Sequence, residues 1–199
     1  MRPSPLTQIR RPGPLLALAA VLLAVLPAAR ALADALDGVL EVQSAFVSVN
    51  QGVYQLYARV KYPASEEAAA ALLDGVSLTY DLDVMVERER RYWVNAEVTS
   101  VTLRRELSYH TVSGRYVVRD ARDGEQSSFG TLESALEAIG TVDGWPIVVE
   151  SQLKGEGEFQ VSLRAGVRRG RLPDALRVLL FWTDDWHRES EWYSWSLPR

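Results

Sequence analysis

Apolar and polar residues alternate along most of this chain, which is the pattern of a β-strand with one buried face. The segment 76–87 is the clearest case, and 54–62 and 158–168 repeat it. The residues that share the apolar face are Val76, Leu78, Tyr80, Leu82, Val84 and Val86; Tyr54, Leu56, Ala58, Val60 and Tyr62; and Phe159, Val161, Leu163, Ala165 and Val167. A helix would scatter these residues around its circumference. The pattern therefore predicts antiparallel strands with one wet face.

Turn residues separate the expected strands. Asn50-Gln51-Gly52 and Ser113-Gly114 each predict a hairpin turn, because glycine accepts the positive φ that such turns need. The strands joined are expected over 40–49 and 53–62, and over 98–110 and 115–120. Asp143-Gly144 is expected to open a further strand that runs through Pro146. Proline lacks a backbone N–H, so this strand should be an edge or have Pro146 at its entry.

Two short helices are expected between the strands. Ser65 is a good N-cap for a helix over 66–73, with acidic residues in its first turn and Gly75 just past its end. Thr131 should cap a second helix over 132–139, with Gly140 as its stop. The segment 173–176 has the composition of a helical turn.

Together these segments give about eight or nine strands and two helical insertions. The spacing of the strands by turns predicts an antiparallel β-sandwich, with a half-open barrel as the alternative. No linker or internal repeat divides the region, so residues 34–199 are expected to form a single domain.

Residues 1–33 have the features of an export signal. Arginines precede an apolar run from Leu15 to Leu26, and Ala31-Leu32-Ala33 supplies the small-x-small pattern of a cleavage site before Asp34. The run is about 12 residues, which is short for a helix crossing a hydrocarbon core of ~30 Å. We expect a cleaved signal peptide and a periplasmic protein, with an uncleaved N-terminal membrane anchor as the alternative. No later stretch is apolar and long enough to span a membrane.

The net charge and the absence of cysteine exclude several classes of function. Residues 1–33 contain four of the 22 basic residues and none of the 26 acidic ones, so the formal charge of residues 34–199 is −8. A net negative domain lacks the electrostatic footprint of a nucleic-acid-binding protein. With no cysteine, disulfides, thiol nucleophiles and cysteine-ligated metals are excluded. No cofactor is expected.

Candidate catalytic groups are few. Nucleophile elbows, phosphate-binding glycine loops and zinc-protease motifs are missing from the sequence, which makes an enzyme the less favoured class. His110 is expected at a hairpin tip, on the face opposite Leu103. His187 follows Asp184 and Asp185 closely, and this group is expected to be a polar turn, with a divalent metal site as the alternative.

Tryptophans are concentrated near the C-terminus. If 191–197 is a strand, Tyr193, Trp195 and Leu197 share its core face, whereas Trp192, Ser194 and Ser196 share the other. Exposed tryptophan is enriched at interfaces. The candidate binding surface therefore consists of Trp182, Trp186, His187 and Trp192.

Several blocks resemble a family of exported proteobacterial proteins known as a domain of unknown function, number four-three-nine-zero. The blocks are 89–97, 103–118, 128–144 and 182–197, together with the expected strand at 76–88. The resemblance implies a small periplasmic or envelope protein, whose relatives tend to be encoded beside a nitrogen-regulation-type sensor kinase and response regulator. It implies no catalytic or ligand-binding residues.

The sequence thus favours a non-catalytic binding or accessory module at the cell envelope. The expected partner is an envelope or inner-membrane protein, with the extracytoplasmic domain of a sensor kinase as one candidate. A small-ligand binding protein for a lipid or saccharide is the first alternative, and a metal-assisted hydrolase using Asp184, Asp185 and His187 is the second. The oligomeric state is left open.

Overall fold

The computed structural model describes residues 40–90, 94–155, 157–170 and 187–197. Their order in the chain is β1 (Glu41–Asn50), β2 (Val53–Lys61), α2 (Glu66–Leu73), β3 (Leu78–Arg88), β4 (Ala96–His110), β5 (Arg115–Asp120), β6 (Gln126–Phe129), α3 (Leu132–Gly140), β7 (Thr141–Val149), a 3-10 turn (Glu150–Gln152), β8 (Phe159–Arg169), β9 (His187–Glu189) and β10 (Tyr193–Ser196). The expected signal peptide and the segment 173–176 lie outside the described residues.

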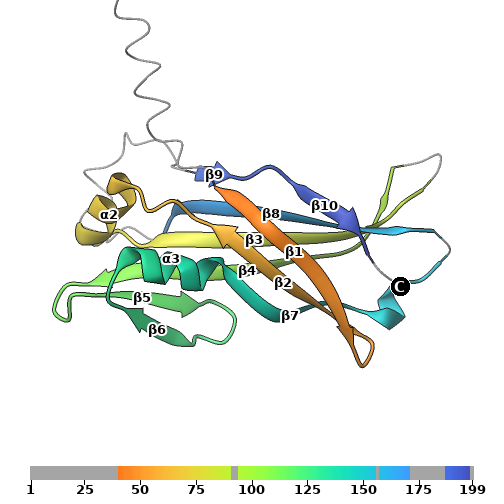
Figure 1. Ribbon diagram of the computed structural model, residues 1–199, viewed down its shortest axis with the longest axis horizontal. Helices are drawn as coiled ribbons and strands as arrows, with labels where there is room; N and C mark the ends of the chain where they lie inside the picture. Colours follow the sequence, from red (N-terminus) through yellow and green to blue (C-terminus); the bar gives the residue numbers. More distant parts are fainter. Residues whose placement is uncertain (1–39, 91–93, 156, 171–186, 198–199) are drawn as a thin grey trace, which may run out of the picture. The chain divides into compact units, whose positions relative to one another are not determined.

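Two antiparallel sheets form the fold. The small sheet has the order β1-β2-β7, and the large sheet has the order β10-β8-β3-β4-β5-β6, with β9 also paired to β8. The small sheet and α3 lie over the same face of the large sheet (Figure 1). The β-sandwich prediction is confirmed, and ten strands are described because β6 and β9 add strands of four and three residues.

One hydrophobic core lies between the two sheets and under both helices. The three apolar stripes expected from the sequence are all buried, from Tyr54 to Tyr62 in and after β2, from Val76 to Val86 around β3, and from Phe159 to Val167 in β8. Period-2 alternation puts each stripe on the inner side of its sheet and the intervening polar residues on the outer side. The outer side of the large sheet is consequently a polar surface.

The predicted caps and hairpins are present. Gln51 and Gly52 have φ angles of 50° and 75°, the left-handed pair that closes a two-residue hairpin between β1 and β2. The Ser65 hydroxyl accepts a hydrogen bond from the Ala68 N–H at 3.1 Å and begins α2. The Thr131 hydroxyl does the same for Ser134 at 3.2 Å and begins α3.

The segment around Asp143-Gly144 differs from its prediction. It does not open a strand, because β7 begins at Thr141 directly after α3 and runs through it. Gly144 has φ 69°, and the register of β7 against β2 shifts on this stretch, so the pair forms a bulge inside the strand rather than a turn. β7 is an edge strand, as Pro146 indicated.

Candidate functional site

The outer side of the large sheet carries a connected set of charged side chains, which we call the charged face. It consists of Asp81 and Asp83 on β3, Arg104 on β4, Arg164 and Arg168 on β8, and His187 and Glu189 on β9. β3 lies in the middle of this face. Its register places Asp81 opposite Arg104 on one neighbouring strand and Gly166 on the other, and it places Asp83 opposite Thr102 and Arg164.

Asp81 joins three strands. Its Oδ1 accepts a hydrogen bond from Arg104 Nε at 2.6 Å, and its Oδ2 accepts one from Arg168 Nε at 2.9 Å. The carboxylate is mostly enclosed, with 16% of its side chain exposed, whereas the two arginines are almost half exposed. The hydrogen bond that Arg104 donates to Asp81 raises the pKa of the Arg104 guanidinium. The two arginines are therefore held in fixed positions with their outer edges facing solvent.

Arg164 links a second group of charges. Its guanidinium bonds Glu189 Oε2 at 2.5 Å and lies 3.5 Å from Asp83 Oδ2, and Asp83 also accepts a hydrogen bond from the Thr102 hydroxyl at 2.6 Å. Glu189 in turn lies 3.3 Å from His187 Nε2. Arg164 Nε is buried and has no hydrogen-bond partner in the described part of the chain.

Trp192 covers this second group. Its ring lies over the Arg164 guanidinium, whose central carbon is 4.7 Å from the ring centroid. Such a cation–π contact contributes about 0.5–1 kcal/mol at a partly exposed site. The indole nevertheless remains 42% exposed. The strand end thus presents a large aromatic side chain whose position is fixed from beneath.

Two of the four predicted surface residues come together here, and two lie outside the described residues. His187 and Trp192 are connected through Glu189 and Arg164, so one chain of contacts runs from the imidazole to the indole. Trp182 and Trp186 fall in the segment 171–186, which the structure does not describe. Asp184 and Asp185 also fall there, so the metal alternative stays a prediction.

Sequence reasoning missed the paired charges of β3, β4 and β8. The alternation already put Asp81 and Asp83 on one face of β3 and Arg164 and Arg168 on one face of β8. What it lacked was the pairing of these strands, which places residues more than eighty positions apart in contact. The available signal was the presence of five charges of mixed sign on the polar faces of three predicted strands.

His110 stands apart from this group. It ends β4 on the outer side of the large sheet, as predicted, and its Nδ1 lies 2.9 Å from the Ser113 hydroxyl within its own turn. A pocket of about 290 Å³ beside it is lined by Ser77, Glu106, Ser108, Tyr109, His110, Val117, Arg119 and Gln126. His110 contacts a turn residue here and is no part of the charged face.

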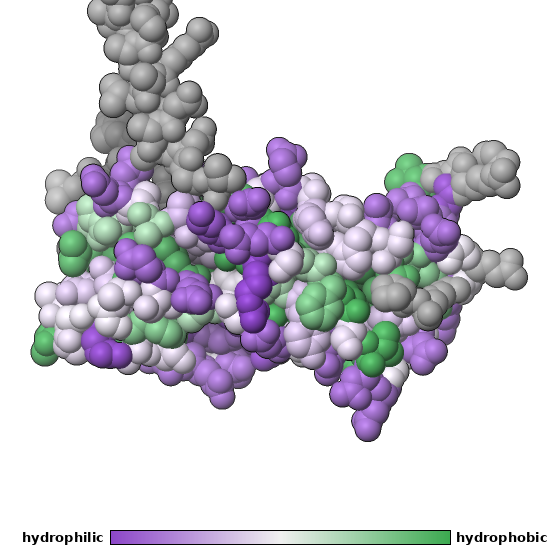
Figure 2. Space-filling model, viewed as in Figure 1, coloured by the Kyte–Doolittle hydropathy of each residue, from purple (hydrophilic) through white to green (hydrophobic). Residues whose placement is uncertain are grey.

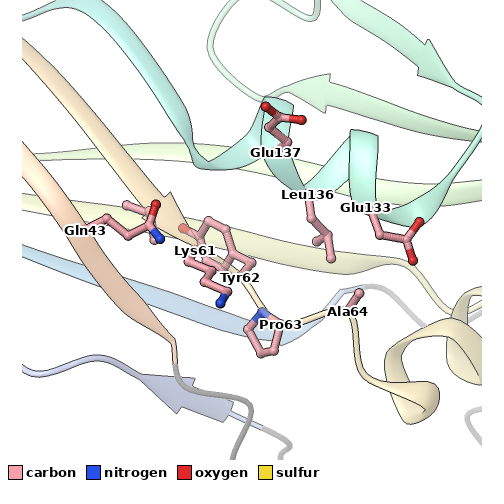
Figure 3. Close-up of a pocket in the computed structure, with 9 residues that line it drawn as sticks. Gln43, Lys61, Tyr62, Pro63, Ala64, Glu133, Leu136 and Glu137 are labelled. Atoms are coloured by element: carbon pink, nitrogen blue, oxygen red, sulfur yellow. The ribbon is translucent and has the colours of Figure 1, made fainter.

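A second pocket lies between the end of β2 and α3, with a volume of about 330 Å³ (Figure 3). Leu136 of α3 faces the Tyr62 ring and Pro63 across it, and these side chains make its wall apolar. Its rim is charged, with Glu133 and Glu137 on the helix side and Lys61 on the strand side. The volume lies at the small end of the range for ligand pockets, about 300–1,000 Å³.

Comparison with known proteins identifies the family. A family model with the description "Domain of unknown function (DUF4390)" matches residues 38–196, which include every described element. The chain belongs to this family. The resemblance drawn from the sequence blocks is thereby confirmed. No curated protein and no solved structure matches the chain.

The family description names no activity, so the function is inferred from the residues of the site. In the described part of the chain, no three histidine and acidic side chains come together as a metal site would require. Neither of the two described helices is long and apolar enough to cross a membrane. The charged face offers hydrogen-bond donors, paired charges and a fixed indole, which together suit recognition of another surface.

Proposed function

We propose that this DUF4390 chain is a non-catalytic binding module exported to the cell envelope. Its partner is an inner-membrane protein, and the extracytoplasmic domain of a sensor kinase is the first candidate. The observation that carries this proposal is the position of Trp192, which is 42% exposed yet held over Arg164 on an ordered charged face. Export rests on the signal-like residues 1–33.

The residue types of the charged face suit protein recognition. Tryptophan and arginine are the residues most enriched among interface hot spots, where truncation to alanine costs about 2 kcal/mol or more. Arg164 and its carboxylate partners are already paired before binding, so little side-chain entropy remains to be lost there. Preordering of this kind favours a specific partner over a general electrostatic attraction.

The first test is crosslinking in living cells. A photoreactive amino acid replaces Ser194 in one strain and Val112 in another, so that Trp192 itself is kept. Ser194 is exposed next to Trp192 on the same side of the sheet, and Val112 is 95% exposed on the β4–β5 turn and away from the charged face. We expect one inner-membrane protein to crosslink at position 194 and not at position 112. Equal crosslinking at both positions, or none at position 194, would contradict the proposal.

A matched pair of variants then tests the contact. Trp192 and Tyr193 are neighbours with exposed fractions of 42% and 41%, but they lie on opposite faces because Tyr193 pairs with Leu163 of the core stripe. Trp192→Ala should weaken binding to the captured partner by about 30-fold, which corresponds to ~2 kcal/mol, whereas Tyr193→Ala should leave it within about twofold. Equal losses would show that the charged face is not the contact surface.

A second candidate function is small-ligand binding in the pocket between β2 and α3, favoured by its apolar wall and charged rim. A fluorescent fatty acid is a suitable probe. Ala64→Trp should fill the pocket mouth and abolish binding of the probe, because Ala64 lines the pocket. Ala70→Trp places the same side chain on an exposed position of α2 and should leave binding unchanged. If the wild-type protein does not bind the probe, this candidate fails for lipids.

A further inference from the structure

β1 is a long strand at the edge of the small sheet in the described part of the chain. Among the described strands it pairs with β2 alone, along ten residues from Glu41 to Asn50. An edge strand of this kind presents a row of unpaired backbone N–H and C=O groups that can pair with a further strand.

The geometry of the β1–β2 turn determines which backbone N–H and C=O groups of β1 point away from β2. Asn50 and Val53 flank the two-residue turn, and such flanking residues form a hydrogen-bonded pair. Hydrogen-bonded and non-hydrogen-bonded pairs then alternate along the ladder. The backbone N–H and C=O groups of Ala45, Val47 and Val49 therefore point away from β2.

Of the strands at the ends of the two described sheets, β1 alone lacks a protecting feature; β4 also has an open side from Ala96 to Arg104, where β5 does not reach, but it carries Glu97 and Arg104 there. Among the described strands, β6, β9 and β10 are edges of only three or four residues. β7 is longer, but it contains Pro146 and the bulge at Gly144. Short strands, prolines and bulges are the usual devices that keep an edge from pairing. From Val42 to Asn50, β1 has no proline and no charged residue, and its register irregularity is confined to the stretch between Val42 and Ser44.

Apolar side chains are exposed beside this free edge. Val49 is 49% exposed although it lies opposite the buried Tyr54, and Phe46 is 57% exposed on the outer side. Figure 2 shows apolar surface over the distal half of the β1–β2 hairpin, next to the hydrophilic turn. β1 contacts β8, and β10 lies one strand beyond β8, where Tyr193 is 41% exposed. An additional strand on β1 would cover this open side of the sandwich.

We propose that the occupant is a second copy of this chain, paired antiparallel through β1. In the symmetric register centred on Val47, Ala45 of each copy lies opposite Val49 of the other. All three positions have their free backbone groups on the pairing side, so the two strands exchange hydrogen bonds at each of these pairs. The result is one continuous sheet of order β7-β2-β1-β1-β2-β7, which uses both free edges and stops at the dimer.

Charge and size are compatible with this self-pairing. Glu41 is the one charged residue of β1, and in this register it extends past Asn50 of the other copy, so no like charges meet. The small Ala45 side chain leaves room for the inward-facing Val49 opposite it. Because β1 has no charged residue from Val42 to Asn50, this edge offers no ion-pair partner to a charged segment of another protein. The dimer is independent of the proposed function, because the charged face lies on the far side of the large sheet.

The mass of the full chain in solution, measured by light scattering after gel filtration, tests the proposal. We expect twice the mass of one chain for the wild type, and one chain's mass for Val49→Lys, which puts an ammonium group inside the new sheet face. Val112→Lys is the control, because Val112 is another exposed valine, on the β4–β5 turn. It should remain dimeric. Wild-type protein that stays monomeric from low to high micromolar concentration overturns the proposal.

Crosslinking tests the register. The chain has no cysteine, so a single introduced thiol can report on one position. Val47→Cys places two thiols opposite one another with Cα atoms about 5.5 Å apart, within the range that a disulfide spans. Ser44→Cys places them about 20 Å apart, six residues along an extended strand. Oxidation should link the first variant and not the second. A dimer in which neither variant crosslinks, or in which both do, contradicts pairing through β1.

Discussion

Arg105 offers the sharpest test of how this fold is held together. It lies on β4 between the outward-facing Arg104 and Glu106, and its own side chain points inward, opposite Tyr80. Its Nη1 donates hydrogen bonds to the carbonyl oxygens of Ala138, Ile139 and Thr141 at 3.0, 2.8 and 2.9 Å. These carbonyl groups lie at the C-terminal end of α3, which has no basic residue in its own last turn.

The cost of removing this contact can be worked out from the geometry. One nitrogen carries two hydrogens, so the three contacts amount to about two hydrogen bonds from a charged donor, each of ~1.5–3 kcal/mol. Burial lowers the pKa of the Arg105 guanidinium, which means that part of this gain offsets a desolvation cost. We therefore expect Arg105→Met to lower the free energy of unfolding by about 2–4 kcal/mol.

The adjacent arginine provides the control. Arg104 is 47% exposed and bonds Asp81 on the polar side of the same strand. Arg104→Met should cost at most about 1 kcal/mol, because exposed ion pairs contribute little. Urea titration followed by tryptophan fluorescence measures the free energy of unfolding of both variants. The melting temperature should fall by roughly 6–12 °C for the Arg105 variant alone. If the two variants differ by less than ~0.5 kcal/mol, the hydrogen bonds to α3 do not stabilise the fold as argued.

Three further outcomes follow from packing and burial. Phe159→Ala should lower the free energy of unfolding by about 3–5 kcal/mol in a urea titration, because the ring is 2% exposed and its removal leaves a cavity. Gly140→Ala should destabilise strongly in a thermal melt, since a Cβ there would collide with the Val60 carbonyl, whereas Gly130→Ala has open space and should melt as the wild type does. Burial raises the pKa of Tyr62, so the stability it contributes is complete below the unfolded pKa of about 10 and is lost as pH rises above it. Tyr62→Phe should flatten the fall in stability between neutral and strongly alkaline pH, and an unchanged slope would show that this hydroxyl does not titrate with unfolding.

The local structure was predictable because it depends on neighbours in sequence. Alternation placed Leu82 inside and Asp83 outside, and the caps at Ser65 and Thr131 began helices at the expected residues. Strand pairing was not predictable, because many registers satisfy the same alternation. The contact between Asp81 and Arg168 depends on that pairing, and so does the charged face.

Arg105 shows a second limit. An arginine on the apolar face of a strand contradicts its pattern, and only the position of α3 above β4 explains it. Trp192 shows the reverse case. Its parity against Tyr193 was sufficient to place it on the polar side, but its contact with Arg164 required the pairing of β10 with β8.

The order of strands within the sheets also governs how the chain can fold. β2 is completed by β7, and β3 is completed by β8, so both sheets need strands from the second half of the sequence. Pairings between such distant residues give the fold a high contact order, for which slow folding is expected. A nascent chain that ends before Phe159 lacks β8, which is one of the two strands that pair with β3 along all eleven of its residues. The domain should therefore fold late and as a unit, once β8 has been synthesised.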